Sequence, residues 1–149
     1  MSSSQPPKIH FQQASYQDVG FLVFLRKLTM DEHLAKAGIV MNDLQHQARI
    51  LEFFEQSFLI KVDDHVVGVI KLGIENLALH IRQFQILPEC QGKGIGGQVI
   101  DLCKKKAVEK GVDLTLNVLL ENPAKQLYLN HGFTVEQSDD LQHFMRWTA

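Results

Sequence analysis

Apolar residues follow two periods along the chain, and these periods predict its secondary structure. A strand-like period of two covers residues 8–14, 58–62, 66–72, 77–87, 114–120, 133–137 and 141–147. A helical period covers residues 21–28, 44–54, 95–110 and 124–131. The helix at 95–110 is expected to join two parallel strands, 77–87 and 114–120. The order predicts the α+β class, with a mixed, mostly antiparallel sheet of about seven strands.

The first half of the chain carries few motifs. Ser15 and Asp18 have the spacing of a capping box, which predicts the start of the first helix. That helix is apolar almost all round, so we expect it to be buried. Residues 29–42 are polar and contain a glycine, which predicts a loop or a short helical turn. Residues 1–7, rich in Ser and Pro, are expected to form a loose tail.

The strand at residues 77–87 has a defect in its alternation. Its apolar residues fall on odd positions up to Ile81 and on even positions from Phe84. A slip of one residue turns side chains to the opposite face unless a bulge absorbs the extra residue. We therefore predict a β-bulge between Arg82 and Phe84. The alternative is a regular strand that changes which of its faces is buried.

A turn dense in glycine follows this strand. Pro88 ends the strand, residues 91–97 contain four glycines, and a helix begins at once and runs to Gly111. This order aims unpaired backbone N–H groups and the positive end of a helix dipole at one point. The segment therefore predicts a binding site for a phosphate or pyrophosphate.

Three phosphate-binding motifs compete for this turn. A Walker A loop is excluded because Lys93 is followed by Gly94 rather than by Ser or Thr. The dinucleotide pattern G-x-G-x-x-G is present as Gly92, Gly94 and Gly97, with Glu121 downstream in the place of a ribose ligand. A dinucleotide-binding domain, however, needs repeated βαβ units with the motif in the first of them, and here the motif follows an antiparallel hairpin. The third motif is Gln91-x-x-Gly94-x-Gly96 after a strand that ends in Pro88.

Composition narrows the class of protein. At 149 residues, with 45% hydrophobic and 21% charged residues, the chain is expected to be a single globular domain over 1–149. A net charge of −2 offers no basic face for nucleic acid. No apolar run is long enough for a membrane span, and no secretory signal begins the chain. Two cysteines favour reduced thiols and a cytoplasmic location, and the scattered histidines predict no metal site.

Two motifs together resemble the GNAT superfamily of acyl-CoA-dependent N-acetyltransferases. The first is Ile86-Leu87-Pro88 leading into Gln91–Gly96. The second is Asn122-Pro123-Ala124, followed by Leu127-Tyr128 and Gly132-Phe133. The resemblance implies a GNAT-like fold with four helices and a bulged central strand. It also implies transfer of an acetyl group from acetyl-CoA (coenzyme A) to a primary amine, directly and through a tetrahedral intermediate.

The resemblance also implies roles for single residues. Backbone groups at Gln85, Ile86 and Leu87 would pair with the pantetheine arm. The pyrophosphate would be held by amides of Gln91, Gly92, Lys93, Gly94, Ile95 and Gly96. Asn122 would bond the pantetheine, cap its own helix, or do both. Tyr128 would lie near the sulfur and protonate the departing thiolate as a general acid.

The general base and the acceptor stay open. Where the family often has a carboxylate, this chain has Gln83 and Gln85. His80 on the same strand and Glu32 or His33 after the first helix are the nearest candidates for a base that deprotonates the amine, and deprotonation through water is the alternative. The missing carboxylate also motivates an alternative, a non-catalytic acyl-CoA binding module. The acceptor is an amine on a small molecule or a protein, and the resemblance leaves a homodimer open.

Overall fold

A computed structural model describes residues 8–149 of the chain, and the expected loose tail at residues 1–7 lies outside the described residues. A seven-stranded sheet has the order β1-β2-β3-β4-β5-β7-β6. The strands are β1 (Ile9–Gln13), β2 (Ser57–Val62), β3 (His65–Glu75), β4 (Ala78–Ile86), β5 (Leu114–Leu119), β6 (Thr134–Ser138) and β7 (Gln142–Trp147). All neighbours pair antiparallel except β4 and β5, which are parallel. The predicted class, strand number and single parallel step are confirmed.

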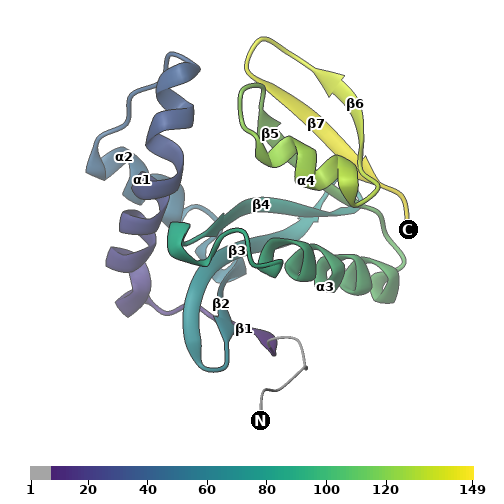
Figure 1. Cartoon of the computed structure of the whole chain (residues 1–149), viewed down its shortest axis with the longest axis horizontal. Helices are drawn as coiled ribbons and strands as arrows, with labels where there is room; N and C mark the ends of the chain where they lie inside the picture. Colours follow the sequence, from purple (N-terminus) through teal and green to yellow (C-terminus); the bar gives the residue numbers. More distant parts are fainter. Residues whose placement is uncertain (1–7) are drawn as a thin grey trace.

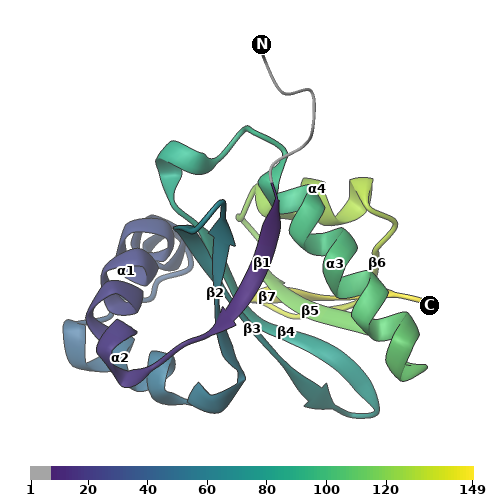
Figure 2. The ribbon, with the colours of Figure 1, turned by 90° about the horizontal axis from the view of Figure 1, so that it is seen from below.

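In the described part of the chain, four α-helices cover the two faces of the sheet (Figures 1 and 2). The first face carries α1 (Val19–Lys36) and α2 (Asp43–Leu51), and the second carries α3 (Ile95–Lys110) and α4 (Ala124–Asn130). Because successive side chains of a strand point to opposite faces, the sheet contributes to two separate hydrophobic cores. Leu59 packs with α1 and α2, whereas its neighbour Ile60 packs on the side of α3. Within residues 8–149, no helix is long and apolar enough to cross a membrane.

The predicted bulge is confirmed. Lys71 of β3 pairs with Gln83, and the next residue, Leu72, pairs with Ile81, so Arg82 is the extra residue on β4. A bulge bends its strand and increases the local twist. At this position β4 turns away from β5, because the two strands pair only from Leu79 to Ile81 on the β4 side.

The prediction of a loop or short turn at residues 29–42 is wrong for its first part, because α1 continues to Lys36. Thr29 does not break the helix, since its hydroxyl donates to the carbonyl of Leu25 within the helix (2.8 Å). The helix ends where Gly38 takes a left-handed conformation. The expectation of a fully buried helix is also wrong, because Phe24 and Leu28 are at least half exposed on its outer side.

The second helix is shorter than predicted. It ends at Leu51, Phe53 is left-handed (φ 51°), and Phe54 belongs to a separate 3-10 turn, Phe54–Gln56. The carbonyls at the end of α2 have an unusual partner. The buried Lys71 of β3 donates from Nζ to the carbonyls of Arg49 (3.0 Å), Ile50 (3.1 Å) and Glu52. A cation at the negative end of the helix dipole stabilises this terminus.

Candidate active site

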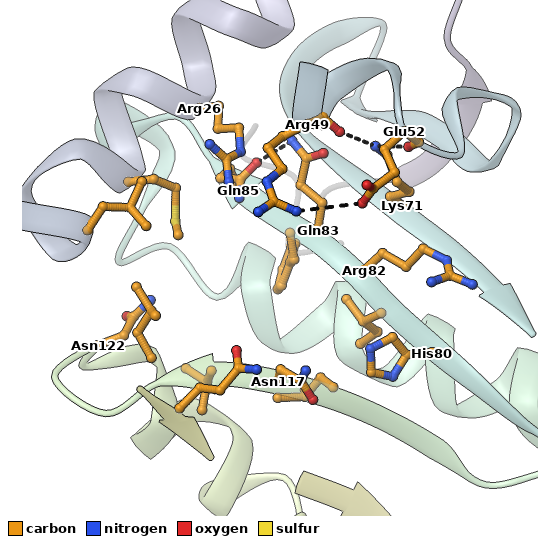
Figure 3. A pocket seen from close by; sticks show the side chains of 18 of the residues that line it. Arg26, Arg49, Glu52, Lys71, His80, Arg82, Gln83, Gln85, Asn117 and Asn122 are labelled. Atoms are coloured by element: carbon orange, nitrogen blue, oxygen red, sulfur yellow. Dashed lines mark hydrogen bonds and ion pairs between the residues drawn. The ribbon is translucent and has the colours of Figure 1, made fainter. Parts of the chain in front are cut away.

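A cleft opens where β4 and β5 separate. The two strands pair only at Leu79–Leu114, His80–Thr115 and Ile81–Leu116, although both continue further. Beyond the bulge, residues 83–85 of β4 and 116–119 of β5 line opposite sides of a cavity of about 480 Å³. This volume is in the range of small-molecule sites. Figure 3 shows Gln83 and Gln85 on one wall, with Asn117 and Asn122 across from them.

The edge of β4 has backbone groups free to pair with a ligand. The amide of Leu87 donates to Val67 of β3 (2.8 Å), so alternation turns the main-chain groups of Phe84 and Ile86 the other way, toward the opening. Among residues 8–149, the carbonyl of Ile86 accepts the side-chain amide of Gln91 (3.0 Å) and no backbone amide. An extended ligand arm can therefore add to this edge as a strand does.

The glycine turn after β4 forms an open cradle. A 3-10 turn, Pro88–Cys90, leads into Gly92 and Gly94, both of them left-handed (φ 76° and 80°). A Cβ at either glycine would meet no atom within 4 Å, so the space in front of the turn is open. Within residues 8–149, no backbone or side-chain acceptor takes the amides of residues 92–97. These amides begin the 16-residue helix α3, and together they make an anion site.

Tyr128 faces the cleft from α4. Its side chain is buried and packs against Phe133 with ring centroids 5.8 Å apart. Within the described part of the chain, its hydroxyl has no hydrogen-bond partner, yet it is not among the fully enclosed atoms without one. The hydroxyl therefore reaches the cleft. Burial raises the pKa of Tyr128 to about 12, so the phenol keeps its proton at neutral pH.

Asn122 lies at the start of α4 and lines the same cleft. Its side-chain oxygen accepts the amide of Ala124 (2.9 Å), so it caps the helix. Because the side-chain oxygen of Asn122 is occupied in this way, its NH₂ group is the part of the side chain that is left for a ligand.

The candidate bases His80 and Glu32 lie in different places. His80 lines the cleft, with Nδ1 2.8 Å from the hydroxyl of Thr115 and Nε2 3.7 Å from a carboxylate oxygen of Glu75. Burial lowers the pKa of His80, so its ring is neutral at neutral pH. Glu32 does not reach the cleft, because it lies on the exposed side of α1 beside Lys36.

Several cleft residues carry no motif and were not predicted. They are Arg26 of α1, Arg49 of α2, Lys71 and Glu75 of β3, and Asn117 of β5. A signal for two of them is present in the sequence. Arg26 interrupts an apolar helix, and Lys71 interrupts an apolar strand. A charge inside an apolar element has to find a partner or a cavity.

The arrangement fits a thioester that carries a diphosphate. The edge of β4 at Phe84 and the Tyr128 side chain line the cleft, and the anion cradle follows β4 in the chain, with Gly96 close to Leu127 of α4. No group of three His, Cys, Asp or Glu side chains within residues 8–149 is placed to hold a metal ion.

Comparisons with known proteins show the family and agree with the fold. A family profile for the acetyltransferase (GNAT) domain matches residues 12–149. Among solved structures, PaiA N-acetyltransferase from Thermoplasma acidophilum, in complex with coenzyme A, is 19% identical with a TM-score of 0.76, over 95% of this chain and 99% of that chain. An acetyltransferase from Thermus thermophilus is 20% identical with a TM-score of 0.74, over 95% of this chain and 97% of that chain. None of the curated protein sequences matches significantly.

Proposed function

The chain belongs to the acetyltransferase (GNAT) domain family, and we propose that it transfers an acetyl group from acetyl-CoA to a primary amine. One observation carries the proposal. A strand edge without a partner and a protonated phenol line one cleft, and an open anion cradle follows directly after that strand. The coenzyme A in the Thermoplasma relative's structure supports the choice of co-substrate.

The proposed binding mode uses the main chain for most of the co-substrate. The amides from Gly92 to Gly96 would hold the pyrophosphate, with the dipole of α3 adding to their attraction, whereas the amide of Gln91 already donates to the carbonyl of Pro88 (3.2 Å). The backbone at Phe84 and Ile86 would pair with the amide groups of the pantetheine arm, whereas the main-chain groups expected to do so at Gln85 and Leu87 face β3 and are not available. Asn122 would add its side-chain NH₂ while its oxygen caps α4.

The proposed chemistry is direct transfer. The amine nitrogen attacks the thioester carbonyl, a C–N bond forms, and the C–S bond breaks. A backbone amide freed by the bulge at Arg82 would stabilise the oxyanion. Tyr128 would donate to the sulfur. A thiol, with a pKa of ~8.5, is a stronger acid than this phenol, so Tyr128 acts mainly through its hydrogen bond and full proton transfer needs a supply from solvent.

His80 is our choice for the base. An amine with a pKa of ~10.4 arrives protonated and has to lose a proton before it attacks. The neutral His80 ring can accept that proton at Nε2, directly or through a water molecule, if Nδ1 donates to Thr115. Glu75 then stabilises the positive ring. Glu32, which lies outside the cleft, has no part in this proposal.

A thermal-shift titration with acetyl-CoA, CoA and NAD tests the co-substrate. We expect stabilisation by both CoA species and none by NAD. In Gly94→Glu, a side chain and a negative charge would fill the cradle, and the shift should disappear. Gly111→Glu is the matched control, because Gly111 is left-handed and open too but lies at the other end of α3.

Turnover separates an enzyme from a binding module. Release of free thiol from acetyl-CoA in the presence of an amine supports the acetyltransferase. Stabilisation by acetyl-CoA without thiol release from any amine would favour the non-catalytic module. A shift with NAD alone would contradict both.

A further inference from the structure

Two guanidinium groups face the cleft from the helices that carry no motif. Arg26 comes from α1 and Arg49 from α2, and both line the cavity. They lie close enough for the charge of Arg49 to lower the pKa of Arg26, after the larger effect of burial. Figure 3 shows both on the wall across the cleft from Asn117 and Asn122.

The other charges of the cleft are already paired. Arg82 donates to Glu75 (2.9 Å) and to Gln56 (2.8 Å), and it lies over the ring of Phe53. Lys71 is held by three backbone carbonyls. Glu75, in turn, is shared between Arg82 and His80.

The two remaining arginines are only weakly neutralised. Arg49 has one long contact to Glu52, 3.9 Å, between side chains that are both more than half exposed. Such a contact contributes little. Arg26 makes no ion pair with any carboxylate of the described residues; its side-chain partners are a sulfur and a histidine ring.

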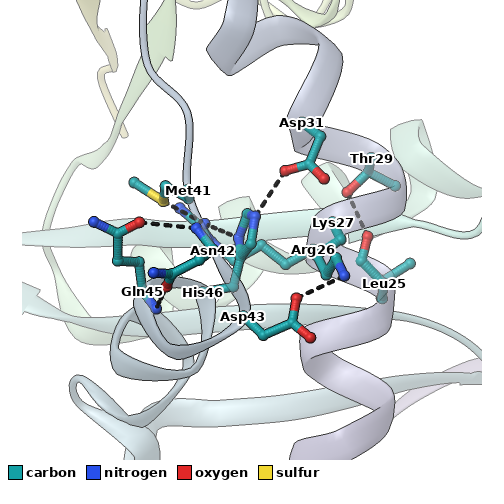
Figure 4. Close-up of polar contacts among 10 residues, drawn as sticks. All are labelled: Leu25, Arg26, Lys27, Thr29, Asp31, Met41, Asn42, Asp43, Gln45 and His46. Carbon is teal, nitrogen blue, oxygen red and sulfur yellow. Dashed lines mark hydrogen bonds and ion pairs between the residues drawn. The ribbon is translucent and has the colours of Figure 1, made fainter.

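Contacts with residues near α2 hold the Arg26 side chain in place (Figure 4). Its Nη1 donates to Nδ1 of the fully buried His46 (2.7 Å) and contacts the sulfur of Met41 (3.4 Å). Since a guanidinium only donates, Nδ1 of His46 accepts, and its Nε2–H donates to Asp31 (2.7 Å). This fixes one edge of the guanidinium and, among the described residues, leaves Nε and Nη2 without a protein partner. Both nitrogen atoms keep some solvent exposure, and Arg26 lines the cleft, so the free edge of the guanidinium faces the cleft.

The acidic residues of this region do not make a site for a cation. Asp31 is used by His46, and Asp43 pairs with Lys27 on the surface (2.6 Å). Glu32 lies outside the cleft beside Lys36. Glu52 also lines the cleft, but its one negative charge is outnumbered by the two positive charges of Arg26 and Arg49. The net charge left for an acceptor is therefore positive, with the flat donor edge that suits a carboxylate or phosphate.

We propose that Arg26 and Arg49 bind an anionic group of the acceptor, so that the substrate is an amine carrying a carboxylate or a phosphate. This inference rests on the proposed function and specifies its acceptor. The anion would lie on the α1–α2 side of the cleft, and the amine would point toward the bulge and His80.

Matched pairs of amines test the proposal. With acetyl-CoA saturating, kcat/KM is measured for β-alanine against β-alaninamide, for O-phosphoethanolamine against ethanolamine, and for 1,3-diaminopropane. We expect the anionic member of at least one pair to be better by about tenfold or more, since a charged hydrogen bond is lost in the neutral one. The pair with the larger ratio tells carboxylate from phosphate. A better neutral amine or diamine overturns the proposal.

Two variants assign the preference to the arginines. In Arg26→Gln and Arg49→Gln, KM for the anionic amine should rise about tenfold, while kcat/KM for its neutral partner stays the same. Lys36→Gln, which removes a charge from α1 outside the cleft, is the matched control. Arg49 is more than half exposed, so its variant should fold even if Arg26→Gln does not. An equal loss for both members of a pair would contradict the assignment.

Binding separates this proposal from the enzymatic one. Calorimetric titration of β-alanine and O-phosphoethanolamine into the CoA-saturated protein needs no turnover. Binding that weakens in Arg49→Gln supports the anion site even if no amine is acetylated, in which case only the proposed reaction fails. Turnover of neutral amines with no binding of either anion leaves the reaction standing and overturns the anion site.

Discussion

Two sets of elements around the cleft offer different kinds of contact. β4 and the turn that leads into α3 present main-chain groups, namely the free edge at Phe84 and Ile86 and the glycine-turn amides. Helices α1 and α2 present side chains, Arg26 and Arg49, the first held in place by His46. Recognition by the main chain depends on backbone geometry, which glycines and a proline reveal in the sequence. Recognition by side chains depends on single residues that no motif or spacing identifies. If this contrast holds, a change in one set of contacts should leave the other set intact.

Tyr128→Phe should have the largest effect on the reaction. Removing the hydroxyl that we propose to donate to the sulfur should lower kcat by ~100-fold, in the range of a lost acid or hydrogen-bond donor at a reacting atom. The thermal shift with CoA should stay, because the cradle and the strand edge are untouched. Steady-state kinetics and the thermal shift check this together. A variant with normal kcat would show that Tyr128 is only a core residue.

Lys71→Met should lower the free energy of unfolding by about 2 kcal/mol, because three carbonyls at the end of α2 lose their donor. The binding of CoA should change little, whereas the position of Arg49 on the same helix end should be disturbed. Urea unfolding measures the loss. Lys61→Met is the control, since Lys61 lies on the neighbouring strand β2. Equal losses of unfolding free energy in both variants would show that Lys71 does not specifically stabilise the end of α2.

The stability of the protein should also depend on pH through Lys71. Burial lowers its pKa to about 8 from an ordinary value of 10.5. Between these values the unfolded chain binds more protons than the folded one, so this group makes stability rise with pH. We expect the wild type to gain stability relative to Lys71→Met from pH 8 to 10.5. A difference that shrinks over this range would contradict the assignment.

His80→Gln should lower kcat/KM by about tenfold at neutral pH, because the amine then loses its proton to solvent alone. Since burial lowers the pKa of His80 below its ordinary 6.5, the wild type should lose activity only on the acid side of that value. The variant should lack this acid limb. If the loss of activity at acid pH persists in the variant, another titrating group is responsible for it.

The smallest effect should come from His46→Gln. Without the ring acceptor, Arg26 loses the contact that orients it, and KM for the preferred anionic amine should rise a few-fold with kcat unchanged. The affinity for CoA should be the same as in the wild type. If CoA binding weakens as well, the two sets of contacts are coupled and the contrast between them fails.

Features that depend on the main chain could be predicted from the sequence, whereas features that depend on the packing of side chains could not. The order of elements, the parallel step and the bulge at Arg82 could be predicted, because periodicity and glycine positions report local backbone geometry. The length of α1 could not, since the polar residues at its end are typical of a loop although they continue the helix to Lys36. The arginine pair was missed because its members lie on two helices, and only packing brings them to one cavity.

The sheet itself is interrupted at its centre. Four strands, β1 to β4, and three strands, β5 to β7, are joined by only three paired positions on β4 and β5. A ligand arm that pairs with the free edge of β4 would complete part of the missing ladder and couple the two halves. We therefore expect hydrogen exchange to slow on both sides of the opening when CoA is bound, and proteases to cut the ligand-free protein faster. The supply of co-substrate would then help to set the lifetime of the protein as well as its rate.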